Sequence, residues 1–191
     1  MGIAYNVAPI RAKDYAYVDV LTESVNNPLR FLVGWFAVVP KLVPPSSVLL
    51  AYWMGGAFLM GIKRYAEYRG IGDARVAALY RPSFARYSER SLLLSAFFYA
   101  MCSAFFGAIF LIKYKIEFVL TFPLFAALFT WYLSIGLKSD SAAQAPETLY
   151  REAKFLLFAS LVFVAAALTF YAEIPALRVL MDTNLVRIPV F

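Results

Sequence analysis

The sequence predicts an all-α fold, a polytopic bundle of transmembrane helices with five spans, in a single domain over residues 1–191. Three observations lead to this prediction. The composition is too apolar for a soluble domain, and five long windows carry most of the apolar residues. The connections between these windows are short and are marked by proline, serine and charged residues.

The composition excludes a soluble globular protein. Hydrophobic residues make up 62% of the chain and charged residues 16%, whereas soluble domains are about 45–50% apolar. One core of a chain this short does not bury so much apolar surface, but a bilayer does. The net charge of +6 would favour a nucleic-acid partner in a soluble protein. Here we attribute it to loop orientation and to an anionic lipid or substrate, and we expect no nucleic acid.

Five windows meet the requirement of about 20 mostly apolar residues for a membrane span. They are residues 18–39, 46–62, 91–112, 116–137 and 154–172. The second window is short, and we expect its helix to continue to about Arg69. Pro40 and the Pro-Pro-Ser-Ser run at 44–47 separate the first two spans, and the serines offer an N-cap to the second. Three residues, 113–115, join the third and fourth spans as a hairpin, and residues 139–152 are predicted to form a loop.

The basic residues predict the orientation. Twelve lie on the side of the N-terminus: Arg11, Lys13, Lys63, Arg64, Arg69, Arg75, Arg81, Arg86, Arg90, Lys138, Arg151 and Lys154. Five lie on the other side: Lys41, Lys113, Lys115, Arg178 and Arg187. Because basic loops are retained in the cytoplasm, we expect a multi-pass protein of the cytoplasmic membrane. Its N-terminus and the 63–90 loop are then cytoplasmic, and its C-terminus lies outside.

Two residue types limit the chemistry. The chain has no histidine, which excludes histidine-based nucleophile activation, histidine general bases and histidine metal ligands. The single cysteine, Cys102, lies in an apolar run, so no disulfide forms within the chain. Any metal would be a hard ion held by carboxylates, and Mg²⁺ is the ion that we expect.

The first span carries a polar stripe. Asp19, Glu23, Asn27 and Arg30 follow at spacings of four, four and three, so they share one helical face, and Asn26 borders it. Charged groups at membrane depth must pair or line a wet cavity. One interpretation is a structural Glu23–Arg30 pair that fixes helix packing. The other is a cavity wall in which Arg30 contacts an anionic group, and the helix kink expected at Pro28 suits such a cavity.

The 63–90 loop carries a second cluster of charge. It opens with Lys63, Arg64 and Glu67, and further charged residues follow from Asp73 to Arg90. One interpretation is that these residues only obey the positive-inside rule. A charged loop of this length among hairpins is also typical of functional segments. Arginine and lysine clusters suit phosphate, and Glu67 or Asp73 would hold Mg²⁺ against it. The expected ligand is a lipid phosphate or diphosphate whose tail runs between the spans.

At these residues the chain resembles the UbiA superfamily of membrane prenyltransferases. Residues 4–13, with Tyr5, Pro9, Arg11 and Lys13, look like the Tyr-x-x-x-Pro-x-Arg-x-Lys end of the family's fourth helix. The stretch from Val18 to Gly34 looks like the fifth helix. Residues 55–67, which end in Lys-Arg-Tyr-Ala-Glu, are similar to the sixth helix of the polyprenyl-phosphate phosphoribosyltransferase branch, whose members make decaprenylphosphoryl phosphoribose. The five spans then match helices five to nine of the nine-helix fold.

The resemblance implies a partial site. Arg11, Lys13, Asn26, Asn27, Arg30, Lys63 and Arg64 would bind the diphosphate or substrate, and Glu67 and Asp73 would contribute to an Mg²⁺ site. The family's Asn-Asp-x-x-x-Asp motif between helices two and three has no counterpart here, and neither do helices one to four. We therefore expect the C-terminal portion of such an enzyme, as a truncation or beside a separate N-terminal half that carries the aspartate motif.

Two functions follow as hypotheses. In the first, the chain is a UbiA-type prenyltransferase, which moves a prenyl or phosphoribosyl group from a diphosphate donor to a lipid or aromatic acceptor and is inactive when alone. Its partners are then a polyprenyl or other isoprenoid lipid and the membrane. In the second, the chain is a non-catalytic membrane subunit or a lipid-binding remnant. A transporter is a weaker third hypothesis, because no inverted repeat or broken-helix pair is visible.

Overall fold

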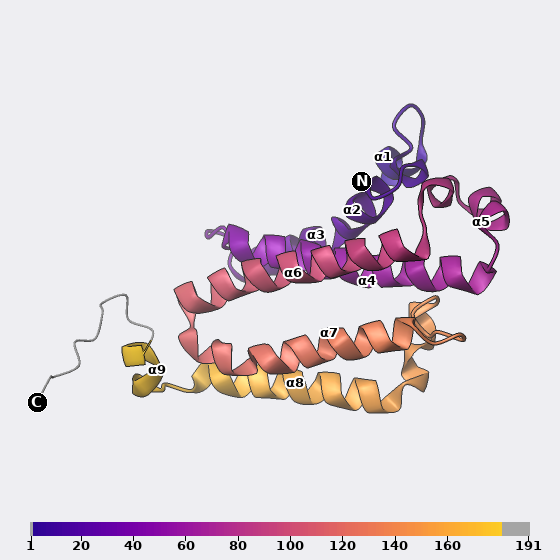
Figure 1. Cartoon of the computed structure of the whole chain (residues 1–191). Helices are drawn as coiled ribbons and strands as arrows, with labels where there is room; N and C mark the ends of the chain where they lie inside the picture. The colour runs from indigo at the N-terminus through magenta and orange to yellow at the C-terminus, as the bar shows by residue number, and fades with distance from the viewer. Residues whose placement is uncertain (1, 181–191) are drawn as a thin grey trace, which may run out of the picture.

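The structure, a computed structural model, describes residues 2–180, and all the elements in this range are helices (Figure 1). In chain order they are α1 (Gly2–Asn6), η1 (Ala12–Asp14), α2 (Val18–Ser24), α3 (Asn26–Val38), α4 (Ser46–Ile71), α5 (Ala74–Tyr80), η2 (Pro82–Arg86), α6 (Glu89–Tyr114), η3 (Ile116–Thr121), α7 (Phe122–Gly136), η4 (Pro146–Arg151), α8 (Ala153–Tyr171) and α9 (Pro175–Leu180). The all-α prediction is confirmed for this part of the chain. Arg187 lies outside the described residues.

Three helical segments are long and apolar enough to cross a membrane: Glu89–Tyr114, Ile116–Gly136 and Ala153–Tyr171. They match the third, fourth and fifth predicted spans. Only 11% of the most apolar stretch of α8 is buried inside the bundle. Phe155 and Val162 pack inward, whereas most of its other large apolar side chains, such as Leu157, Phe163 and Leu168, are exposed, as lipid-facing side chains are. The chain is therefore a membrane protein by the length and composition of these helices. The first two predicted spans stay predictions, because α2 and α3 are short and α4 is less apolar.

The first predicted span is not one continuous helix. It divides at Val25 into α2 and α3, and Pro28 lies in the first turn of α3. Proline lacks an N–H, and its ring clashes with the carbonyl four residues earlier, here that of Ser24, so the helix breaks there. The predicted kink is confirmed, and it divides the polar stripe between two helices.

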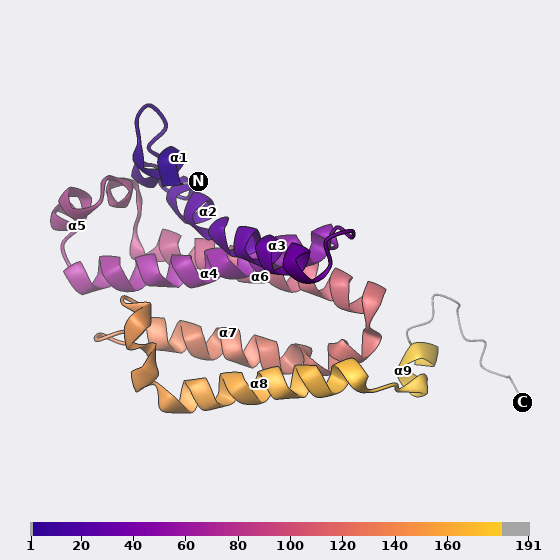
Figure 2. The same ribbon diagram turned by 180° about the vertical axis from the view of Figure 1, so that it is seen from behind.

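Helix α4 is the centre of the bundle and packs along α6 (Figures 1 and 2). Gly61 lies at this contact, where an added Cβ would lie 3.4 Å from the Cβ of Ala96 on α6. The helix continues to Ile71, as expected from the sequence, and ends at Gly72 in the left-handed conformation. The expected serine cap is wrong: Pro45 occupies the N-cap position and no side chain caps the helix.

The long helices alternate in direction, so their connections gather at the two ends of the bundle (Figures 1 and 2). The N-terminal segment, α5 and the connection between α7 and α8 lie at one end, and the α3–α4 and α6–α7 connections lie at the other (Figures 1 and 2). The predicted 63–90 loop is largely helical, since α4, α5 and η2 fill most of it. We call the first of these ends the basic end, because the segments predicted on the N-terminal side lie there.

Candidate functional site

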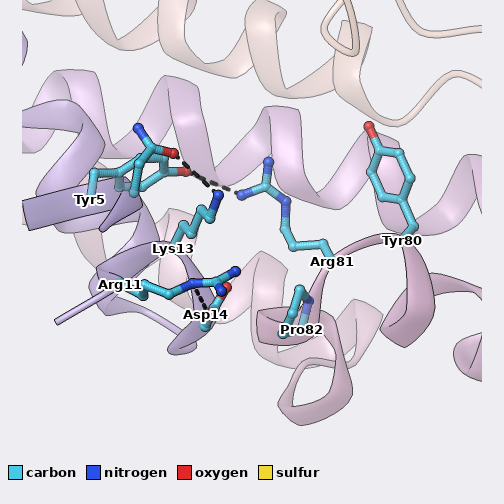
Figure 3. A pocket seen from close by; sticks show the side chains of 8 residues that line it. Tyr5, Arg11, Lys13, Asp14, Tyr80, Arg81 and Pro82 are labelled. Atoms are coloured by element: carbon cyan, nitrogen blue, oxygen red, sulfur yellow. Dashed lines mark hydrogen bonds and ion pairs between the residues drawn. The ribbon is translucent and has the colours of Figure 1, made fainter. Parts of the chain in front are cut away.

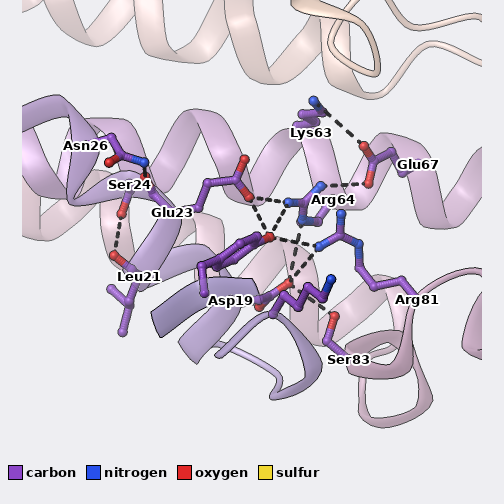
Figure 4. Close-up of polar contacts among 12 residues, drawn as sticks. Asp19, Leu21, Glu23, Ser24, Asn26, Lys63, Arg64, Glu67, Arg81 and Ser83 are labelled. Atoms are coloured by element: carbon purple, nitrogen blue, oxygen red, sulfur yellow. Dashed lines mark hydrogen bonds and ion pairs between the residues drawn. The ribbon is translucent and has the colours of Figure 1, made fainter. Parts of the chain in front are cut away.

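Arg64 is the centre of the polar cluster at the basic end. Its side chain is only 2% exposed, and its three nitrogens lie against three different carboxylates (Figure 4). Nη1 lies 2.9 Å from Glu67, Nη2 lies 2.5 Å from Glu23, and Nε lies 3.6 Å from Asp19. Burial by itself lowers the pKa of Arg64, but the charges of Glu67 and Glu23 outweigh this effect and raise it. The guanidinium is therefore a permanent cation.

The charges of this cluster balance. Asp19 also lies 3.8 Å from Arg81, and Glu67 also lies 4.0 Å from Lys63. The carboxylate cluster, as we name it, thus combines three carboxylates with three cations: Asp19, Glu23, Glu67, Lys63, Arg64 and Arg81. Such a buried cluster is stable only when every charge has a partner.

Tyr5 connects the cluster to the N-terminal segment. Its hydroxyl donates to Glu23 at 2.9 Å and accepts from Arg81 at 3.2 Å and from Arg64 at 3.5 Å. Burial raises the pKa of Tyr5, so the hydroxyl keeps its proton at neutral pH. The phenol of Tyr5 therefore connects α1 to Glu23 of α2 and to the two arginines.

Asp19 is fully buried and has two hydroxyl donors besides the arginines. Tyr87 donates to it at 2.9 Å and Ser83 at 3.2 Å. Burial, with the charge of Asp19 beside it, also raises the pKa of Tyr87. These hydroxyls hold the segment after α5 against α2.

A pocket of about 480 Å³ lies beside the cluster at the basic end (Figure 3). Its lining includes three cations from two segments: Arg11 and Lys13 before α2, and Arg81 after α5. We call it the basic pocket; its remaining lining residues are Tyr5, Asn6, Asp14, Tyr80 and Pro82. Arg11 pairs with Asp14 at 2.9 Å. Lys13 donates to the Oδ1 of Asn6 at 3.2 Å and has no ion-pair partner among residues 2–180.

A second pocket, of about 350 Å³, shares Tyr80 with the basic pocket. Its lining includes Glu67, Asp140 and Gln144 but no lysine or arginine within the described part of the chain. Carboxylates repel an anion. Of these two pockets, the basic pocket has the charge that suits an anionic group.

The structure brings together some of the predicted binding residues and separates others. Arg11 and Lys13 line the basic pocket, whereas Arg64 and Lys63 belong to the carboxylate cluster. Arg30 is exposed on α3, and Glu23 pairs with Arg64 in place of the predicted alternative partner Arg30.

The two asparagines of the stripe also have local roles. Asn26 donates to the Glu23 carbonyl at 3.0 Å, beside the helix break. The side chain of Asn27 packs against Gly56 of α4. Neither asparagine lines the basic pocket. Tyr5 and Arg81 were absent from the predicted set, although Tyr5 belongs to the motif quoted above and Arg81 to the charged loop.

The predicted metal ligands already have partners. Asp73 is the N-cap of α5, where its Oδ1 accepts the backbone N–H groups of Arg75 at 2.8 Å and Val76 at 3.0 Å. Glu67 pairs with Arg64 and Lys63. Over residues 2–180 no three histidine, cysteine, aspartate or glutamate side chains form a group that could hold a metal ion. These residues do not fit an Mg²⁺ site of their own.

Comparison of the chain with known protein families, with curated proteins and with solved structures finds no match. The class of protein that the fold defines is an α-helical membrane protein with a basic pocket at one end of its bundle. The resemblance to the UbiA superfamily stays a prediction.

Proposed function

We propose that this chain is the phosphate-recognising C-terminal portion of a UbiA-like membrane transferase. It binds an isoprenoid diphosphate, or another diphosphate donor, in the basic pocket. The complete enzyme then moves the prenyl or phosphoribosyl group to a lipid or aromatic acceptor. In this proposal the α2–α3 segment and α4 also cross the cytoplasmic membrane, which gives five spans, and the basic end faces the cytoplasm.

The observation that carries the proposal is the set of cations in the basic pocket. Arg11, Lys13 and Arg81 line one cavity at the end of a bundle whose apolar helices bury little of their surface inside it. Arginine forms paired hydrogen bonds with phosphate oxygens and lysine contributes a point charge, so together they suit a diphosphate. A lipid whose headgroup lies in this pocket can extend its tail along the apolar helices.

The role of these residues in the reaction would be electrostatic. When the bond between the transferred group and the diphosphate breaks, negative charge accumulates on the leaving diphosphate. Lys13 and Arg11 would stabilise this charge from the N-terminal segment, and Arg81 from the other wall. Tyr5 and Asp19 hold the Arg81 guanidinium in place through the contacts described above.

Mg²⁺ and a separate N-terminal half belong to the proposal as predictions. Mg²⁺, when bound to a diphosphate, neutralises its charge, and the ligands would come from the aspartate motif of the other half and from the substrate. Glu67 and Asp73 already have partners within this chain.

A second candidate function is a non-catalytic membrane subunit or remnant that binds the same lipid. The observation in its favour is that Asp19, Glu23 and Glu67 are all paired inside the cluster. A general base must reach the proton that it removes, and paired carboxylates are poorly placed to do so.

The test is transfer from labelled farnesyl diphosphate or phosphoribosyl diphosphate in nanodiscs. The chain is assayed alone and with a four-span protein that carries the aspartate motif. We expect Mg²⁺-dependent product only in the combination, and at least a tenfold loss in the R11A/K13A double variant. Binding without product in both samples would favour the non-catalytic subunit. Product that is indifferent to both substitutions would refute the pocket assignment.

A further inference from the structure

We infer that α5 is an interfacial anchor, whose exposed apolar face lies in the headgroup region of the membrane leaflet at the basic end, beside arginines that bind anionic phospholipids. The partner of this surface is the leaflet itself. The inference goes beyond the proposed function, because it concerns the outer face of α5 and holds whether or not the basic pocket binds a diphosphate.

The apolar side chains of α5 are arranged in the opposite way to those of a helix in a soluble protein. The small residue Ala77 is fully buried, in an apolar cluster that includes Phe84 and Leu92. The larger residues Val76 and Leu79 are 53% and 87% exposed, and their spacing of three places them on one helical face. A helix surrounded by water buries its large apolar residues. The outer face of α5 therefore suits an apolar neighbour.

Helix α5 lies where the exposed apolar surface of the bundle begins. The short segment η2 joins it to α6, one of the helices long and apolar enough to cross a membrane. The large exposed apolar side chains of α6 start at Leu94, one turn after Arg90. Both views place α5 at this end of the long helices (Figures 1 and 2). A short helix at this level lies beside the headgroups, where an apolar face can enter the boundary with the acyl chains.

The charges around this face favour an anionic lipid surface as the partner. Arg75 on α5, Arg86 on η2 and Arg90 at the start of α6 are all exposed. None of the three has an ion-pair partner among residues 2–180. The carboxylates nearby in the chain are Asp73, whose Oδ1 caps α5, and Glu89, so the arginines are in excess. Arginine lays its apolar stem along such a boundary and places its guanidinium among the phosphates.

The test measures where the side chain at position 79 lies relative to the bilayer. A spin label is attached to L79C in a C102S background of the full chain in nanodiscs, and its collisions with lipid-soluble oxygen and with a water-soluble nickel chelate are compared. V164C, at an exposed position of α8, is the lipid control, and S139C, in the exposed loop after α7, is the aqueous control. We expect the oxygen-to-nickel collision ratio of L79C to lie between the controls, several-fold above that of S139C. V76C reports independently on the same face and should agree.

The role of the arginines is tested by changing the lipid. The collision ratio of L79C is measured in discs of phosphatidylcholine alone and in discs that also contain phosphatidylserine, with and without the R75Q/R86Q substitutions. Neither arginine lines the basic pocket. We expect phosphatidylserine to raise the ratio and R75Q/R86Q to abolish this rise, because each arginine contributes about fivefold to the equilibrium at an anionic surface.

Three results would overturn the inference. A collision ratio of L79C and V76C equal to that of S139C would show that this face of α5 lies in water. Few collisions with either reagent would show that protein, such as a second copy of the chain, covers the face. A ratio that is the same in neutral and anionic discs, or a rise that R75Q/R86Q leaves unchanged, would show that these arginines do not bind the leaflet.

Discussion

Gly56 of α4 offers a direct test of how the first predicted span packs on the second. A Cβ at this position would lie 2.0 Å from Nδ2 and 3.0 Å from Cγ of Asn27 on α3. In the G56A variant the Asn27 side chain must therefore leave its place. Gly107 provides the matched control, because a Cβ there meets nothing within 4 Å.

The magnitude follows from two opposing effects. Overpacking of a close contact costs about 1–3 kcal/mol, and replacing a helical glycine by alanine gains about 1 kcal/mol. We therefore expect G56A to lose about 1 kcal/mol of stability and G107A to be neutral or stabilised by up to about 1 kcal/mol. In an N27A background the clash is absent, so the same G56A substitution should cost less or become stabilising.

The assay is thermal or denaturant unfolding in detergent, followed by circular dichroism, for the wild type, G56A, G107A, N27A and the N27A/G56A double variant. Equal effects of G56A and G107A would refute the contact between α3 and α4. So would purely additive effects of N27A and G56A, because residues in contact are expected to couple.

Three further predictions concern other parts of the bundle. D73A should destabilise α5 by about 1 kcal/mol while D73S, which keeps a capping oxygen, should be near the wild type; equal loss of transfer activity in both would indicate instead that Asp73 is a metal ligand. G136A should lower Tm more than G107A does, because its Cβ would lie 2.3 Å from Ile62, and equal Tm values would contradict this packing. In a C102S background, cysteines placed at Ser139 and at Lys113 should be labelled by an impermeant thiol reagent from opposite sides of the membrane, and labelling from the same side would refute the up-and-down arrangement.

The helices were predictable because their signals are local. Long apolar windows predicted α6, α7 and α8, and the end of α4 near Arg69 followed from its continuing helical pattern. The kink near Pro28 was predictable from the chemistry of proline alone. The capping role of Asp73 was also predictable, since an aspartate directly before a helix is a common N-cap. The sequence analysis instead predicted that Asp73 is a metal ligand.

The partners of the charged residues were not predictable in this way. A helical period shows which side chains share a face, but it does not show which distant segment packs on that face. Arg64 was assigned to phosphate from its sign and neighbours, whereas its partner Glu23 lies 41 residues away in the chain. The Glu23–Arg30 pair, one of the two interpretations of the polar stripe, assumed a continuous helix, and the chain instead divides at Val25 into α2 and α3.

The central claim is that the basic pocket binds a phosphate-bearing lipid. Its most direct test is equilibrium binding of farnesyl diphosphate to the chain in nanodiscs of neutral lipid, with K13A compared with K154A. Both substitutions remove one lysine charge near the basic end, but Lys154 is an exposed residue that does not line the pocket. The loss of a charge-assisted hydrogen bond of about 1.5–3 kcal/mol predicts at least a tenfold weaker affinity for K13A. K154A should bind like the wild type. Equal affinities of K13A and K154A would contradict the claim.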